Sequence, residues 1–395
     1  MRNPIKFRSA VIFIVLVFSL VVLGTGQTRV DNPGRALAKN AGRVVKLEEV
    51  LRIRDDGETA IFRLPRKLAL GTDGSLFFHD FAEGDRLYRY SPEGKLLYKI
   101  LKTGQGPGES QHVRNFFLDG DRIRVQSWSP PKIMDYGLDG RYMREIPTES
   151  THGLHSLFTA AGRVCGLRDE IPHSQAIFKT GLIETPYSLY EISPNFKVWK
   201  KLHDFPVRHS IKNRSWVRLD MIDATAGGPF VYVVHTAEYR IDQFDLRSGR
   251  VERVIRRAYD QPRSEPSKDE DLDPEAKGIV LPSDIPGFEI FELHAVRDRL
   301  WVFTSTERTG GNERLIDVFD PEGRFVDNFY LEFPDKKMNH RYSKGLITDD
   351  GFLFVPEQEE DGLVSIGKYR ILDADLFPST PDSKRISAAG RNLNK

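Results

Sequence analysis

The sequence contains a single cysteine, Cys165, in 395 residues, so an internal disulfide is excluded. It also lacks an excess of charge of either sign. Its net charge is +1 at pH 7, and basic residues are scattered among acidic ones, so we expect no nucleic-acid partner. Hydrophobic residues make up 39% and charged residues 29%, as in a folded globular chain. A chain of this length predicts several domains or one repeat architecture.

Local signatures of common enzymes are missing as well. There is no H-E-x-x-H zinc pattern and no G-x-S-x-G nucleophile elbow. The stretch "DEDLD" has aspartates at alternate positions, as a calcium loop does, but Pro274 and Val280 occupy the positions that require Gly and Glu. We therefore predict no catalytic residue, no metal ligand and no cofactor. A calcium ion held by side chains from several distant segments stays open as an alternative.

Apolar residues form one long run, at residues 10–24. It follows the basic residues Arg2, Lys6 and Arg8 and precedes the small residues of "GTG". This order is typical of an export signal, and the run is short for a membrane span. We predict that residues 1–26 are a cleaved signal peptide, with a retained N-terminal membrane anchor as the alternative. The protein is then exported to the periplasm, the cell envelope or the extracellular space.

A strand–turn–strand pattern recurs along the chain. It appears as "YSPEGKLLYKI" (90–100), "YGLDGRYMREI" (136–146), "YEISPNFKVWKKL" (190–202), "FDLRSGRVERVI" (244–255) and "FDPEGRFVDNF" (319–329), with a weaker copy, "YRILDADLF" (369–377). A second alternating hairpin precedes each copy, and helical periodicity is nearly absent. Two hairpins in series make a four-stranded antiparallel unit. Six such units predict an all-β fold, a six-bladed β-propeller of four-stranded antiparallel blades.

The pattern also sets expected boundaries. We predict a strand within residues 43–54 that pairs with the sixth unit and closes the ring. The sequence predicts a flexible leader at 27–42, a propeller at 43–378 and a disordered tail at 379–395. Within the propeller, an insertion is expected at 258–287, and the blades lie near 60–103, 110–147, 152–205, 215–257, 288–332 and 341–377. Cys165 lies among strand residues, which predicts a small buried apolar side chain rather than a catalytic thiol.

The stretch "GQGPGE", residues 104–109, follows the first unit and is rich in turn residues. A phosphate-binding loop would need Lys-Ser or Lys-Thr after the glycines and then a helix, and both are missing. We predict instead a structural loop, in which Gly104, Gly106, Pro107 and Gly108 lead from the outermost strand of one blade to the innermost strand of the next.

These features resemble a known family. "GQGPGE", after a first blade of the form "DGSLFFHD…DRLYRY…EGK", is similar to exported bacterial six-bladed β-propellers related to NHL repeats. The resemblance covers about residues 43–378. It implies the fold and export, and it brings no shared catalytic residues. This chain departs from the pattern at "IPHSQAIFKTGLIETPYS" in the third blade and in the sixth blade, which ends without a clear glycine turn.

Propeller geometry places the longer connections on one face, and function tends to lie on loops that a rigid scaffold holds. We expect ligand binding at that face and at the mouth of the channel. The candidate residues are His79, Asp80, Trp128, Arg168, Asp169, His235, Glu238, Arg308 and Glu357. A structural alternative stays open for each, such as Asp80 capping a turn. The insertion at 258–287 is either a flap over the mouth or a solvated loop.

Three functions compete at this point. The first is an exported, non-catalytic propeller that binds a small molecule, a glycan or a protein partner. The second is a metal-dependent hydrolase or lyase with its site in the central channel, because fold alone does not separate binding from catalysis. The third is a structural partner in an envelope complex. A membrane would be contacted only through an uncleaved N-terminal segment.

Overall fold

The computed structural model describes most of the propeller. The described residues are 27–33, 42–54, 63–81, 86–148, 154–170, 181–212, 215–218, 222–235, 238–258, 289–308, 312–334, 337–338, 344–359, 362–373 and 375–377. The predicted signal peptide, residues 259–287 of the predicted insertion and the predicted tail lie outside these ranges. Within them, no helix is long and apolar enough to cross a membrane.

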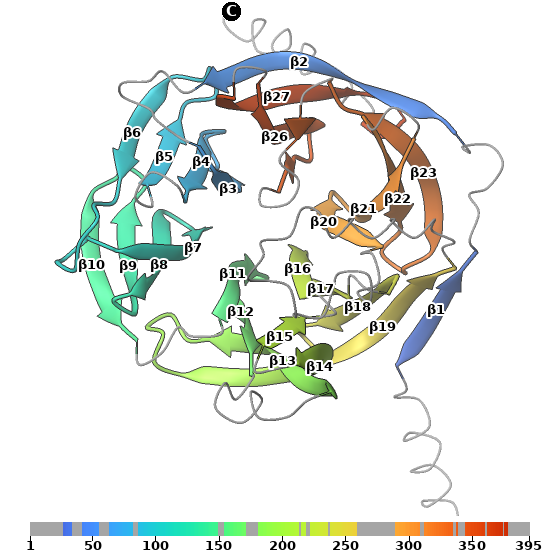
Figure 1. The fold of residues 1–395 in the computed structure, drawn as a ribbon, viewed down its shortest axis with the longest axis horizontal. Helices are drawn as coiled ribbons and strands as arrows, with labels where there is room; N and C mark the ends of the chain where they lie inside the picture. Colours follow the sequence, from blue (N-terminus) through green and yellow to red (C-terminus); the bar gives the residue numbers. More distant parts are fainter. Residues whose placement is uncertain are drawn as a thin grey trace, which may run out of the picture.

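The described strands form antiparallel sheets arranged as blades around a centre (Figure 1). Blade one contains β3 (Pro65–Leu70), β4 (Leu76–Asp80), β5 (Arg86–Tyr90) and β6 (Leu96–Ile100). Blade two contains β7 (His112–Asp119), β8 (Arg122–Ser129), β9 (Lys132–Gly137) and β10 (Tyr142–Pro147). Blade three contains β11 (Leu154–Ala160), β12 (Arg163–Asp169), β13 (Gly181–Ile192) and β14 (Trp199–Lys212), with β15 (Ser215–Arg218) at its edge.

The second half of the ring repeats this plan. Blade four contains β16 (Ile222–Gly227), β17 (Phe230–His235), β18 (Arg240–Asp245) and β19 (Arg250–Arg257), and β1 (Thr28–Asn32) lies beside β19. Blade five contains β20 (Ile290–Val296), β21 (Arg299–Glu307), β22 (Glu313–Phe319) and β23 (Phe325–Glu332). Blade six contains β25 (Leu346–Ile347), β26 (Phe352–Gln358), β27 (Val364–Leu372) and β2 (Val44–Arg54), with the short β24 (Lys337–Met338) paired to β26. The all-β propeller of four-stranded antiparallel blades predicted from the sequence is confirmed.

The sixth blade takes its outer strand from the N-terminal part of the chain. β2 pairs antiparallel with β27 from Lys46 to Arg54, and residues 44–46 also pair in parallel with β23. The stretch 369–377 therefore does not form a hairpin of its own: β27 ends at Leu372, and β2 occupies the place of the fourth strand. That this strand closes the ring stays a prediction.

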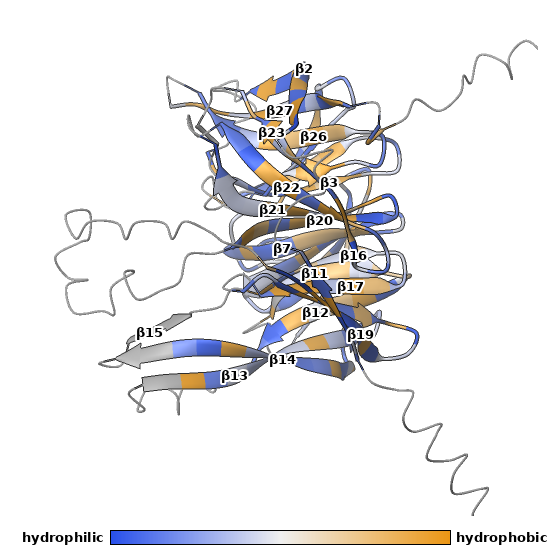
Figure 2. Ribbon diagram, turned by 90° about the vertical axis from the view of Figure 1, so that its right-hand side faces the viewer, coloured by the Kyte–Doolittle hydropathy of each residue, from blue (hydrophilic) through white to orange (hydrophobic). Residues whose placement is uncertain are grey.

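Two elements differ from the expected boundaries. Residues 28–32 of the expected flexible leader form β1, which runs parallel to β19 of blade four. Blade three does not end near residue 205, because β14 continues to Lys212 and pairs there with β15. Residues 215–218 thus belong to blade three and not to blade four. The long strands β13 and β14 extend beyond the body of the ring (Figure 2).

Apolar side chains fill the spaces between neighbouring blades. Each described core cluster joins two blades: Trp301 of blade five packs with Tyr369 of blade six, and Phe78 of blade one packs with Phe354 of blade six. Cys165 is fully buried in the cluster between blades three and four. The predicted burial of this cysteine is confirmed, and burial raises the pKa of its thiol to about 12.

The GQGPGE loop connects β6 of blade one to β7 of blade two and is fastened to blade two. The Glu109 carboxylate accepts a hydrogen bond from the Gly106 N–H at 3.0 Å, and Lys132 Nζ donates to the Gly106 carbonyl at 2.8 Å. A Cβ on Gly104 would lie 2.1 Å from Glu109 Oε2, and Gly108 has φ +72°. The glycines thus permit a close approach and a left-handed turn. The Glu109 carboxylate thus occupies the inside of the loop, which agrees with a structural role.

Candidate functional site

Antiparallel topology gives the ring two different faces. One face, which we call the loop face, carries the connections from the second to the third strand of each blade and from one blade to the next. The other, the turn face, carries the remaining turns. The innermost strands β3, β7, β11, β16 and β20 surround the centre (Figure 1). Polar side chains on or beside these inner strands form a group that we call the axial cluster: Lys67, Asn115, Asp223, Glu292, His294 and Lys344.

The first part of the axial cluster connects three blades. Lys67 of β3 donates from Nζ to Asn115 Oδ1 of β7 at 2.7 Å and to the Leu157 carbonyl of β11 at 3.2 Å. Asn115 also donates from Nδ2 to the Leu157 carbonyl at 3.3 Å. A contact from blade one to blade three must pass blade two on its inner side, so Lys67 Nζ lies toward the ring axis.

The second part connects blades four and six. The Lys344 ammonium, just before β25, forms an ion pair with the Asp223 carboxylate of β16. Desolvation disfavours the charged amine only partly, because the Lys344 side chain is 53% exposed, and the Asp223 carboxylate outweighs this effect and raises the pKa of Lys344 above its ordinary value. Lys67 shows the opposite balance. Burial, with repulsion from Lys344, lowers the pKa of Lys67 to about 7, and attraction to Asp223 offsets only part of this.

The third part comes from β20 of blade five. Glu292 and His294 are two residues apart, so both side chains leave the strand on the same side. Glu292 Oε1 lies 3.1 Å from His294 Nε2, and their side chains are 15% and 10% exposed. The two atoms thus contact each other, and neither has a hydrogen bond to a third group among the described residues. The carboxylate and the imidazole can therefore offer their remaining hydrogen-bonding capacity to a ligand with polar groups.

The axial cluster lies toward the loop face. Lys67 and Glu292 are the third residues of their strands, and Asp223 is the second residue of β16. All three strands begin where the chain arrives from the preceding blade, which is the loop face. The cluster therefore occupies the mouth that the sequence predicted as a binding region, although its residues are different from the predicted ones.

The nine predicted residues are distributed over all six blades. His79 and Asp80 end β4 and are buried. Asp80 Oδ2 accepts backbone N–H groups of Arg63 at 2.6 Å and Leu64 at 2.9 Å. The carboxylate thus caps the chain as it enters blade one, which is the structural alternative for this residue.

In blade four, His235 Nε2 lies 3.0 Å from Asp242 Oδ2, and Arg240 donates two hydrogen bonds to the same carboxylate. Burial alone would raise the pKa of Asp242, but His235 and Arg240 outweigh it and lower that pKa below its ordinary value. Glu238, at the surface, is 3.7 Å from Arg208 of blade three. The contact between Glu238 and Arg208 thus links blade four to blade three.

In blades two and three, aromatic side chains stack with arginines. Trp128 is 43% exposed, and the Arg114 guanidinium lies 5.6 Å from its ring centre. Arg168 lies 5.9 Å from the Trp199 ring centre, and the neighbouring Asp169 is buried. Part of the Trp128 ring is exposed at the rim, which leaves surface on which a ligand can stack.

In blades five and six, the predicted residues form ion pairs. Arg308 is 3.1 Å from Glu313 and stacks on Tyr330. Glu357 is 1% exposed and is bound by the Arg52 guanidinium and by the Tyr369 hydroxyl, which donates at 2.6 Å. Since Arg52 belongs to β2, the Glu357 carboxylate fastens the N-terminal strand to blade six. Ligand binding by all nine residues stays a prediction.

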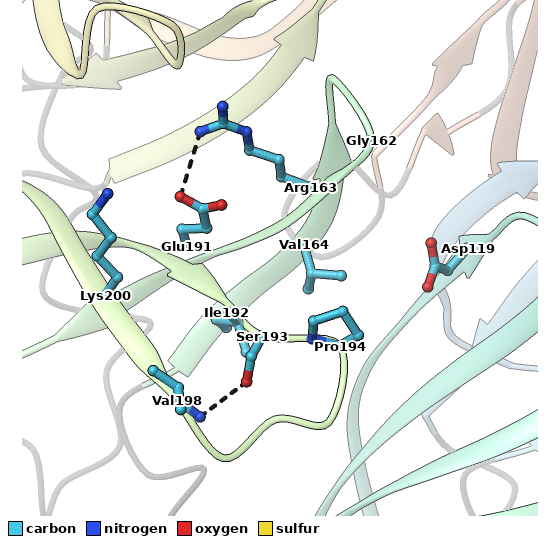
Figure 3. A pocket seen from close by; sticks show the side chains of 10 residues that line it. All are labelled: Asp119, Gly162, Arg163, Val164, Glu191, Ile192, Ser193, Pro194, Val198 and Lys200. Atoms are coloured by element: carbon cyan, nitrogen blue, oxygen red, sulfur yellow. Dashed lines mark hydrogen bonds and ion pairs between the residues drawn. The ribbon is translucent and has the colours of Figure 1, made fainter.

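A separate pocket lies on the turn face between blades two and three (Figure 3). Its volume is about 460 Å³, so the turn face carries a sizeable pocket although its connections are short. Arg163 Nη1 lies 3.4 Å from Glu191 Oε2 and donates to the Leu246 carbonyl at 3.2 Å. Asp119 lies 2.8 Å from Arg124. These charged groups are thus engaged with one another or with backbone carbonyls.

Comparisons with known proteins agree with this architecture. Residues 67–153 match the model of a family described as a 6-bladed beta-propeller, DUF5128. A presumed exported protein of Bacteroides fragilis has a similar structure, with 13% identity, a TM-score of 0.54, and coverage of 88% of this chain and 100% of that one. A DUF4221 family member from Bacteroides vulgatus gives 10% identity and a TM-score of 0.51, covering 84% and 99%. No curated protein sequence matches the chain.

At these identities the solved structures show the fold, and the family match covers blades one and two. A six-bladed β-propeller is thus established. The relation to NHL repeats and the use of GQGPGE as a family signature stay predictions.

Sequence reasoning missed the axial cluster because its members belong to different blades. The signal was nonetheless present, since each inner strand carries a polar residue among apolar ones, as in "PRKLAL" and "IDATAG". No group of three or more His, Cys, Asp or Glu side chains is placed to hold a metal ion within the described ranges. The chemistry on offer at the axis is hydrogen bonding and charge from two amines, two carboxylates, an amide and an imidazole.

Proposed function

We propose that the protein is an exported, non-catalytic β-propeller that binds a small polar ligand at the loop face, through the axial cluster. The observation that carries the proposal is the convergence of six polar side chains from five blades at one end of the ring axis. Contacts that skip a blade, from Lys67 to Leu157 and from Lys344 to Asp223, support this convergence.

Preorganisation supports binding. Each member extends from an inner strand or its end, and rigid strands hold polar groups more accurately than free loops do. The cluster offers donors from Lys67, Lys344 and Asn115 and acceptors from Asp223 and Glu292. A ligand with both acidic and hydroxyl or carbonyl groups would satisfy this set better than an apolar one.

Export is part of the proposal. It is supported by the basic, apolar and small-residue order of residues 1–26 and by the similar fold of a presumed exported bacterial protein. The test is to express the full chain in a bacterial host and to determine the compartment and the N-terminal mass of the product. Product found only in the cytoplasm, with the N-terminus intact, would contradict export.

The binding test is a thermal-shift screen of the exported full chain with a panel of hydroxy acids, keto acids, sugars and amines. Compounds that raise the melting temperature are then titrated calorimetrically. We expect hits to lose at least about tenfold in affinity in Asp223→Asn, which removes the charge that pairs with Lys344. The matched control is Asp121→Asn, at an exposed turn-face carboxylate, which we expect to leave affinity unchanged. Equal affinities in the two variants would refute the axial site.

The metal-dependent hydrolase or lyase remains the alternative. It predicts bound metal in the purified chain and a melting temperature that falls when EDTA is added. The binding proposal predicts less than a stoichiometric amount of metal and an unchanged melting temperature in EDTA.

A further inference from the structure

Lys67 is partly buried, and its hydrogen-bond partners differ from those of a structural lysine. Its two acceptors, Asn115 Oδ1 at 2.7 Å and the Leu157 carbonyl at 3.2 Å, are both neutral. Neither therefore stabilises the ammonium form as a carboxylate would. A neutral amine can donate to both acceptors through its two N–H groups and still has its lone pair to react.

Lys132 of blade two provides a contrast. Its side chain is more deeply buried than that of Lys67, and Nζ lies 2.8 Å from the Glu145 carboxylate and 2.8 Å from the Gly106 carbonyl. A carboxylate at that distance favours the ammonium form, which has no lone pair to react. Lys132 is therefore a structural lysine that fastens the GQGPGE loop.

Burial and the repulsion from Lys344 favour the neutral form of Lys67, whereas Asp223, which pairs with Lys344, favours the ammonium form and offsets part of this effect. The balance lowers the pKa of Lys67 to about 7. At neutral pH the free amine is therefore far more populated in Lys67 than in an exposed lysine with an ordinary pKa, which is neutral in only about one molecule in a thousand.

We propose that Lys67 is a nucleophilic amine that captures an aldehyde or ketone ligand as a reversible imine. The proposal rests on the axial site of the proposed function and names the chemical class of its ligand. The Nζ lone pair forms a C–N bond to the carbonyl carbon while the C=O π electrons move to oxygen. A proton passes from nitrogen to that oxygen, giving a carbinolamine. Loss of water then breaks the C–O bond and forms C=N, with no oxidant or reductant consumed.

The rest of the axial cluster suits this step. The Lys344 ammonium, which is close enough to repel a charge on Lys67, is a potential proton donor for the departing hydroxyl group. Glu292 and Asp223 are acceptors for hydroxyl groups elsewhere on the ligand. A small carbonyl compound that carries further polar groups would use the whole cluster.

The test uses propionaldehyde as the probe, with sodium cyanoborohydride to reduce any imine to a stable secondary amine. The exported full chain is labelled from pH 5.5 to pH 10, and peptide mass spectrometry follows Lys67 and the exposed Lys95 in the same sample. We expect Lys67 to be labelled at least about tenfold faster than Lys95 at pH 7, with a half-maximal rate near pH 7. If Lys67 reacts more slowly than Lys95, or its rate rises only toward pH 10, the proposal is overturned.

A variant separates amine chemistry from simple accessibility. Asn115→Asp keeps the side-chain shape and places a carboxylate beside Nζ, so it should raise the midpoint of Lys67 labelling by about 1–3 pH units. The matched control, Asn195→Asp at an exposed turn, should leave the midpoint unchanged. Equal midpoints in Asn115→Asp and the unaltered chain would overturn the proposal, provided that both melt at similar temperatures.

Failure of this inference and failure of the proposed function are distinguishable. If compounds without a carbonyl group bind and lose affinity in Asp223→Asn while Lys67 labels like Lys95, only the imine chemistry is refuted. If Lys67 labels with a midpoint near pH 7 but the panel shows no binder that depends on Asp223, the reactive amine is supported and the binding function is refuted.

Discussion

A buried ion pair between blades four and five provides the most demanding test of how the ring is held together. Arg257, at the end of β19, and Asp317, in β22, are 3% and 0% exposed in their side chains. Asp317 Oδ2 also accepts the Tyr239 hydroxyl of blade four at 2.6 Å, and the Arg257 guanidinium lies 4.4 Å from the Phe325 ring centre. The pair thus joins two blades with little access to water.

The perturbation is Asp317→Asn, which keeps the shape of the side chain and removes its charge. Arg257 then loses the negative charge of its Asp317 partner while it stays buried. Breaking a buried pair in this way costs about 3–5 kcal/mol of the free energy of unfolding. With an unfolding entropy of about 2.1 cal/mol/K per residue, that loss lowers the melting temperature of a chain of this length by about 4–6 °C.

The assay is thermal and urea unfolding of the exported chain, followed by circular dichroism. The matched control is Asp31→Asn, because Asp31 pairs with Arg29 at 2.7 Å while both side chains are more than half exposed. Exposed pairs contribute about 0–1 kcal/mol. Replacing the buried pair by Arg257→Met with Asp317→Leu should recover most of the lost stability. If Asp317→Asn costs no more than Asp31→Asn, the inter-blade role of the pair is refuted.

Three further predictions concern other contacts. Gly108→Ala should lower the free energy of unfolding by about 1–2 kcal/mol more than Gly120→Ala, because both glycines have positive φ but a Cβ at Gly108 would lie 3.1 Å from the Tyr142 ring. Equal urea midpoints for the two variants would contradict the fastened loop. Ile53→Ala should lower the free energy of unfolding by about 2–5 kcal/mol, since Ile53 of β2 packs between blades six and one, and Val50→Ala, at an exposed position, by less than about 1 kcal/mol. Similar losses in the two variants would argue against closure by β2. Asp242→Asn should destabilise the chain at pH 7. The difference in stability between the variant and the unaltered chain should vanish as the pH falls through the depressed pKa of Asp242, because protonation then removes the same charge in the unaltered chain. A constant difference down to pH 2 would exclude this charge effect.

Local chemistry in the sequence predicted the blades well. Turn residues such as those of "SPEG" and "GLDG" mark tight reversals, and Gly94 and Gly140 have positive φ there. These signals lie within a few residues of one another, so single-sequence reasoning can read them. The same holds for GQGPGE, whose Glu109 and glycines form contacts inside the loop.

Features that depend on pairing between distant segments were harder to predict. β1 lies beside β19, more than two hundred residues away, and nothing in "TRVDN" indicates that partner. The extension of β13 and β14 beyond the ring arises from pairing between "GLIETP" (181–186), where the third blade departs from the family pattern, and residues 206–211. The axial cluster is the extreme case, since Lys67 acquires its role only when Asn115 and Leu157 arrive from two other blades.

The central claim is that the ligand binds at the axial cluster, and the most direct measurement is a crystal structure of the chain with a hit from the thermal-shift panel. The account predicts that the ligand lies at the loop-face end of the axis, with polar atoms within hydrogen-bond distance of at least two of Lys67, Asp223 and Glu292. A ligand bound instead in the turn-face pocket beside Arg163, or among the outer loop residues such as Trp128, would contradict it.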